Sequence, residues 1–287
     1  MNDQNGQQNE QQNGQQNDQQ NDYQHSQIER MVEPDAPKMG VGSRILNLIT
    51  SPSELMRNIK LYPVVLIPLL LSIAIGLISI PTQQRFTEVY LQELSHISIE
   101  MYGVDLSGWT TLQEMDVYGD VGDVAGLLDI VTLVGLAAAS LFTPPLLSFL
   151  SALMLFIFSK IAKGSATLGQ LFSAYMHIYV IIAIGSFVMS GLIAATGNFL
   201  DVTSLAALVM PHGNLSMPLF NILSYISIFN IWVTFLTFVA VKELNGFSNV
   251  KAGIITGIAF AVSAGLTVGT FMLTFWGWNV TASAMGL

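Results

Sequence analysis

The sequence predicts an all-α fold: a polytopic integral membrane helix bundle with about five transmembrane helices, a cytoplasmic amino terminus and a disordered Gln/Asn-rich tail. Three observations lead to this prediction. Of the 287 residues, 52% are hydrophobic and only 10% are charged, whereas a soluble domain carries roughly 25% charged residues. Several apolar stretches reach the length of about 20 residues that a membrane span needs. The basic residues fall almost entirely in a few short segments between these stretches.

The amino-terminal tail is a region of its own. Residues 1–38 are rich in Gln and Asn, and the hexapeptide at residues 4–9 recurs at residues 12–17. Because this region has no apolar face to bury, ordering it would cost about 1–2 kcal/mol per residue without compensation. We therefore expect a disordered tail, residues 1–38, before a transmembrane domain, residues 39–287. A self-associating prion-like tract is the alternative, which the interspersed acidic residues disfavour.

Five spans are predicted from hydropathy and length. The apolar stretch at residues 124–159 is too long for one span and short for two, and Pro144-Pro145 interrupts it. We place one span at 144–159 and expect 124–143 to be an interfacial helix, a re-entrant segment or the far end of a kinked helix. The other four spans are expected at residues 62–80, 175–196, 217–241 and 252–276.

The positive-inside rule favours a single crossing in this ambiguous stretch. With one crossing, nine of the ten basic residues lie on the cytoplasmic side and Arg85 alone lies outside. The outer loop 82–125 is then long and acidic, and it contains apolar residues at helical spacing that predict a short amphipathic helix: Phe86, Tyr90, Leu94, Ile97 and Met101. On the inner side, the capping box at 51–54 predicts that residues 45–61 form a helix at the membrane surface.

Composition excludes several classes of function. A net charge of −9 with only ten basic residues argues against nucleic acid as a partner. The chain has no cysteine, which excludes disulfides and thiol chemistry. Phosphate-binding, zinc-protease and serine-hydrolase motifs are also absent from the sequence. We therefore predict no catalytic, cofactor or metal residues and no enzyme activity. The expected partners are the lipid bilayer, other membrane proteins or a second copy of the chain.

The last span carries the clearest packing pattern. Small residues recur every four positions along one stripe of the helix: Gly253, Gly257, Ala261, Gly265 and Gly269. Such small-xxx-small patterns let another helix approach closely in a membrane. The stripe predicts either packing within the bundle or the seam of a homodimer.

Four polar residues in or near the spans are further candidates, because a polar group at membrane depth is often functional. They are Asp129, His177, Asn221 and Asn230. Their spacing does not gather them into a ligand set. For His177 we weigh a hydrogen-bonded interfacial side chain against a proton-relay or catalytic role, and the first is the expectation.

Three segments resemble the Yip (Ypt/Rab-interacting protein) domain family of polytopic membrane proteins, in its prokaryotic branch. They are Ile49–Ser53 with Ile59 and Pro63, then Lys160–Ser165 with Leu168–Phe172, and finally Val241–Ser248 with Lys251-Ala252. The Asp-Leu-Tyr-Gly-Pro motif of the eukaryotic branch is missing. The resemblance implies five spans, membrane organisation or trafficking-like scaffolding, and a bacterial or archaeal plasma membrane. It brings no catalytic residues.

Two functions follow from these patterns. The first is a non-enzymatic membrane scaffold that acts through oligomerisation or partner proteins. The second is a transporter or channel component for a small or lipidic substrate, which predicts a wettable cavity between the spans lined by Asn221, Asn230, Tyr175 or His177.

Overall fold

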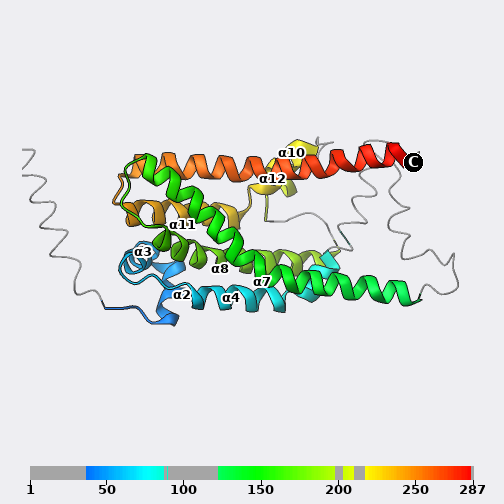
Figure 1. The fold of residues 1–287 in the computed structure, drawn as a ribbon, viewed down its shortest axis with the longest axis horizontal. Helices are drawn as coiled ribbons and strands as arrows, with labels where there is room; N and C mark the ends of the chain where they lie inside the picture. Colours follow the sequence, from blue (N-terminus) through cyan, green and yellow to red (C-terminus); the bar gives the residue numbers. More distant parts are fainter. Residues whose placement is uncertain (1–36, 87–88, 90–121, 198–202, 210–216, 286–287) are drawn as a thin grey trace, which may run out of the picture. The chain divides into compact units, whose positions relative to one another are not determined.

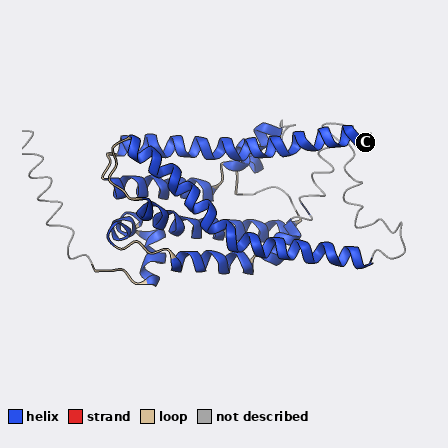
Figure 2. Ribbon diagram, in the orientation of Figure 1, coloured by secondary structure: helices blue, strands red, loops and turns tan. Residues whose placement is uncertain are grey.

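The computed structural model describes residues 37–86, 89, 122–197, 203–209 and 217–285. The chain divides into two units, Met1–Gly40 and Val41–Leu287, and the second unit holds every helix named below. Within the described residues all regular structure is helical apart from one isolated bridge, Ser204–Ser227 (Figure 2). The predicted disorder of the tail and the amphipathic helix expected at 86–101 lie outside the described residues, apart from a few positions near residue 86 and residues 37 and 38.

The helices run in the order shown in Figure 1. Four are long and apolar enough to cross a membrane, at Ile130–Ile161, Leu168–Thr196, Ile228–Asn245 and Asn249–Thr267, and the bent pair Leu66–Ile78 and Ile80–Phe86 makes a fifth candidate. This confirms the predicted all-α membrane bundle. The helix bounds are α2 Val41–Thr50, α3 Pro52–Leu61, α4 Leu66–Ile78, α7 Gly122–Ile161, α8 Leu168–Thr196, α9 Ala206–Val209, α10 Met217–Tyr225, α11 Ile228–Asn245 and α12 Asn249–Met285.

Residues 124–143 and the predicted span 144–159 belong to one helix. Helix α7 is continuous over 40 residues and passes through Pro144 and Pro145. Of the three possibilities for residues 124–143, the structure therefore has the far end of the same helix. A proline removes a helical hydrogen bond and bends the helix without necessarily ending it, and α7 changes direction partway along its length (Figure 1).

The predicted fourth span, 217–241, is broken in two. Helix α10 ends at Tyr225, and α11 begins after Ser227, whose hydroxyl accepts a hydrogen bond from the Asn230 amide at 3.2 Å. The freed backbone groups pair with residues 203–205, through Leu205 N–H to Ile226 O at 3.0 Å and Ile228 N–H to Thr203 O at 3.1 Å. A break at membrane depth needs such replacement partners.

The first span also departs from the predicted range of 62–80. Residues 63–65 are not helical, α4 begins at Leu66, and the chain bends by 53° after Ile78. The Ser79 hydroxyl donates to Gly76 O at 2.7 Å. Such local bonds compete with the helical ladder and accompany kinks.

The predicted third and fifth spans match helices, with different starts. Helix α8 begins at Leu168, ahead of the predicted residue 175, because Thr167 and Gln170 form a complete capping box. Helix α12 contains the whole predicted range 252–276.

The inner surface helix of the prediction is two helices, α2 and α3. Ser51 does stand at the amino-terminal cap of α3 with Pro52 after it, but its side chain makes no capping hydrogen bond. Leu55, Met56 and Ile59 are fully buried in the main hydrophobic core with residues of α8 and α11. The apolar face of α3 is therefore covered by the bundle itself.

Candidate functional site

One end of the bundle collects the basic residues. Helix α7 ends and α8 begins there, and α11 ends and α12 begins there, with α3 alongside (Figure 1). The resulting cluster, which we name the basic end, contains Arg44, Arg57, Lys60, Lys160, Lys163, Lys242 and Lys251. This is the arrangement that a single crossing by α7 predicts.

Asn245 connects three segments at the basic end. Its side-chain oxygen accepts from Ala166 N–H at 3.1 Å, and its amide donates to Ser159 Oγ at 3.3 Å and to Val241 O at 2.9 Å. The side chain is only 8% exposed. Gly164 packs directly over it, because a Cβ there would collide with the Asn245 side chain and lie 2.8 Å from Phe247 Cζ. Asn245 thus holds the loop between α7 and α8 against the end of α11.

Arg44 fastens α2 to α3 at the same end. Its Nη2 donates to Asn58 Oδ1 at 2.7 Å and to Tyr62 O at 3.0 Å. Burial lowers the pKa of the Arg44 guanidinium below its ordinary value, although an arginine remains charged in a protein. The buried guanidinium therefore holds α2 against α3 through these two hydrogen bonds.

The ion pair between Arg57 and Glu243 joins α3 to α11 at 2.9 Å. We expect Arg57→Ala to lower the free energy of unfolding by about 1 kcal/mol, because the Arg57 side chain is 68% exposed and screened by water, although the Glu243 side chain is only 11% exposed. A double-mutant cycle with Glu243→Gln in mixed micelles measures the coupling. A coupling above about 2 kcal/mol would contradict this expectation.

The small-residue stripe of α12 faces outward. Gly253, Gly257, Ala261 and Gly265 are exposed and Gly269 is partly exposed. A Cβ built at any of the four glycines meets no atom within 4 Å. Among the described residues nothing packs against the stripe, which is an exposed surface of that part of the chain.

The polar candidates are not brought together. His177 is 1% exposed, and its Nδ1 lies 2.7 Å from Ser173 O. Asn230 donates through Nδ2 to Tyr225 O at 2.8 Å and closes the break between α10 and α11. Asp129 lies in α7 and Asn221 in α10, but their side chains are outside the described part of the structure. Among the described residues no three His, Asp or Glu side chains are grouped to hold a metal ion.

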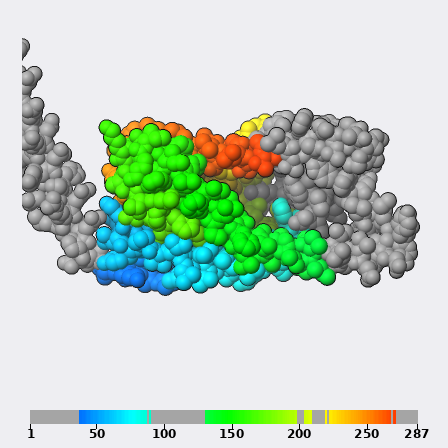
Figure 3. Space-filling model, in the orientation of Figure 1, coloured from blue at the N-terminus to red at the C-terminus, as the bar shows by residue number. Residues whose placement is uncertain are grey.

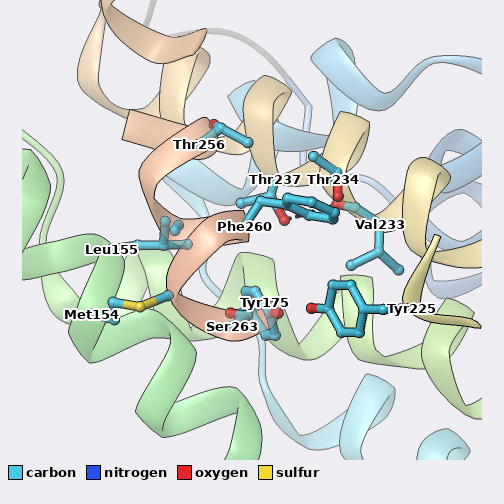
Figure 4. Close-up of a pocket in the computed structure, with 11 residues that line it drawn as sticks. Met154, Leu155, Tyr175, Tyr225, Val233, Thr234, Thr237, Thr256, Phe260 and Ser263 are labelled. Carbon is cyan, nitrogen blue, oxygen red and sulfur yellow. Dashed lines mark hydrogen bonds between the residues drawn. The ribbon is translucent and has the colours of Figure 1, made fainter. Parts of the chain in front are cut away.

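A cavity that the sequence analysis did not locate lies between α7, α8, α10, α11 and α12 (Figure 4). Among the described residues, six that bear hydroxyl groups and five apolar ones line it, and none of these is charged: Tyr175, Tyr225, Thr234, Thr237, Thr256, Ser263, Met154, Leu155, Val233, Ala259 and Phe260. Of the four residues expected to line such a cavity, Tyr175 does so, whereas His177 and Asn230 do not. The spacing of Thr234 with Thr237, and of Thr256 with Ser263, places each pair on one helix face. This pattern in the sequence could have indicated a polar cavity beside these two helices.

The fold and these surfaces define a multi-pass integral membrane protein. Compared with protein-family models, with curated proteins and with solved structures, the chain has no match.

Proposed function

We propose that the chain is a non-enzymatic membrane scaffold whose copies associate through the outward-facing stripe of α12. The observation that carries this proposal is the uncovered row of small residues, on which a second helix could approach to backbone contact. A glycine offers a lipid chain no side chain to pack against, so contact with lipid alone does not explain these small residues. A second copy of the same stripe is a complementary partner, because a twofold axis places identical surfaces against each other.

The basic end would then present a combined surface to cytoplasmic partners. It lies next to the tail in sequence, and the positive-inside rule places such an end in the cytoplasm. The resemblance to the prokaryotic branch of the Yip domain family suggests the same kind of role, membrane organisation in a bacterial or archaeal plasma membrane. The three segments of that resemblance include the loops that Asn245 joins.

Disulfide cross-linking in membranes tests the proposal cleanly, because the natural chain has no cysteine. Ala261→Cys on the stripe should yield a disulfide-linked dimer after mild oxidation, since the sulfur atoms at a close twofold seam can meet. Gly135→Cys is the matched control, being an exposed glycine of α7 with no atom near its Cβ position. Equal cross-linking of both variants, or of neither, would refute the seam. Cross-linking mass spectrometry of the full chain in native membranes then identifies any protein partner.

The second candidate function, a transporter or channel component for a small or lipidic substrate, is favoured by the cavity alone. Flux of a substrate into vesicles that contain the purified chain would support it over the scaffold.

A further inference from the structure

Hydroxyl groups from several helices converge in the cavity. The Tyr225 hydroxyl points toward Tyr175 and Ser263 (Figure 4), and the Tyr225 ring lies against Phe260 with 5.4 Å between centroids. These groups come from α8, α10 and α12, which are far apart in the sequence. The cavity therefore combines a polar floor with an aromatic and aliphatic wall.

The hydrogen bonds that the lining threonines already make indicate which groups of a ligand the cavity can bind. Thr234 Oγ1 donates to Asn230 O at 2.7 Å and Thr237 Oγ1 to Val233 O at 2.8 Å. Both oxygens keep lone pairs that can accept. Thr256 Oγ1 differs, since it is buried without a hydrogen-bond partner among the described residues, in a residue only 5% exposed. Because this oxygen has almost no exposed surface, a ligand in the cavity would instead meet the oxygens of Thr234 and Thr237, which can accept a hydrogen bond that the ligand donates.

The depth of the cavity places it inside the bilayer. Met154, Tyr175 and Thr256 each stand seven residues from the end of their helix at the basic end, which corresponds to about 10 Å. A charged head at that depth would meet no counter-charge from the described lining residues, all of which are uncharged. The ligand is therefore neutral.

The size of the cavity and its route to the bilayer limit which ligands can bind. The centres of water molecules can occupy about 40 Å³ of the cavity, and one water needs about 10–15 Å³ of such space, so the cavity suits a head of a few atoms. Helices α7 and α12 lie together near the basic end and diverge toward the opposite end, and the surface is hollowed between them (Figure 3). Because residues of both α7 and α12 line the cavity, this gap is the route by which we expect an apolar chain to extend into the bilayer.

We propose that the cavity binds the head of a neutral amphiphile bearing one or two hydroxyl groups, such as a long-chain alcohol or a monoacylglycerol. The site is independent of the scaffold proposal, because its α12 residues, Thr256, Ala259, Phe260 and Ser263, lie off the small-residue stripe. Loss of the dimer would leave it intact, and loss of the ligand would leave the dimer intact.

Photolabelling tests this with the full chain in phosphatidylcholine nanodiscs. The probe is a monoacylglycerol with a diazirine in its acyl chain and an alkyne tag, and mass spectrometry locates the labelled peptides. Because the diazirine is in the acyl chain, labelling should concentrate on α7 and α12, which flank the gap through which that chain leaves the cavity. Excess 1-monooleoylglycerol should lower it at least about fivefold once its free concentration exceeds about four times its Kd. Methyl oleate, which has the same chain and no hydroxyl group, should not.

Conservative variants provide the second readout. Tyr175→Phe with Tyr225→Phe removes two lining hydroxyls and should lower labelling about fivefold. Tyr179→Phe is the control, because Tyr179 is a buried tyrosine of α8 that does not line the cavity. Equal competition by both lipids, labelling spread over all outward helix faces, or wild-type labelling of the double variant would each overturn the proposal. The competition arm needs no variant and remains decisive if the double variant misfolds.

Discussion

Gly257→Leu or Gly265→Leu is expected to lower the dimerisation constant of the chain in the bilayer by about tenfold. Two leucines facing each other across a seam would hold the backbones apart and remove the close contact on which membrane helix association depends. A loss of about 1.4 kcal/mol corresponds to that tenfold change. Neither side chain should disturb the monomer, because each Cβ position is open to beyond 4 Å.

The dimer fraction is measured by energy transfer between differently labelled copies in liposomes across a dilution series. Gly135→Leu on α7 is the matched control, another exposed glycine with no neighbour near its Cβ position. It should dimerise as the wild type does. If all three variants behave alike, α12 is not the seam, and association must use another face.

Gly164→Ala is expected to cause the largest loss of stability among the single changes considered, about 2–3 kcal/mol. The added methyl group would occupy the position of the Asn245 side chain. Displacing that side chain leaves Ala166 N–H and the Ser159 hydroxyl without their partner, and each unsatisfied buried group costs about 1–3 kcal/mol. Asn245→Ala should have a similar effect, because it removes the same three hydrogen bonds.

Thermal unfolding in detergent, followed by tryptophan fluorescence, measures the effect. Gly169→Ala is the control five residues away, since it is exposed in the first turn of α8 and meets no atom within 4 Å. Alanine is the better helix former by about 1 kcal/mol, so this variant should be as stable as the wild type or slightly more so. Equal stability of Gly164→Ala and Gly169→Ala would show that the contact with Asn245 contributes little.

The helical class of the fold could be predicted because a long apolar stretch has few alternatives in a protein. The single crossing of α7 could also be predicted, since it depends only on which side Lys160 and Lys163 share with other basic residues. The break at residues 226–227 could not. The segment 217–241 is mostly apolar, and the partners that satisfy its free backbone groups, residues 203–205, are remote in sequence.

The candidate sites also include features that could be predicted from the sequence and features that could not. The position of the small-residue stripe follows from a four-residue repeat on one helix, whereas the direction it faces depends on the neighbours of α12. The cavity depends on five helices at once, so its hydroxyl groups are scattered single residues in the sequence. The environment of His177 could be predicted more easily, because its ring bonds to Ser173 O, four residues earlier on the same helix.

The length of α7 has a consequence for the thickness of the surrounding bilayer. Its apolar part, Ile130–Ile161, contains 32 residues and measures about 48 Å. Even at a tilt of about 40°, the steep end of the range found in membrane proteins, it would span about 37 Å against a hydrocarbon core of ~30 Å. The change of direction along α7 shortens this span further (Figure 1). The remaining hydrophobic mismatch would favour thicker bilayers around the protein, so that α7 would sort the protein among membranes of different lipid composition.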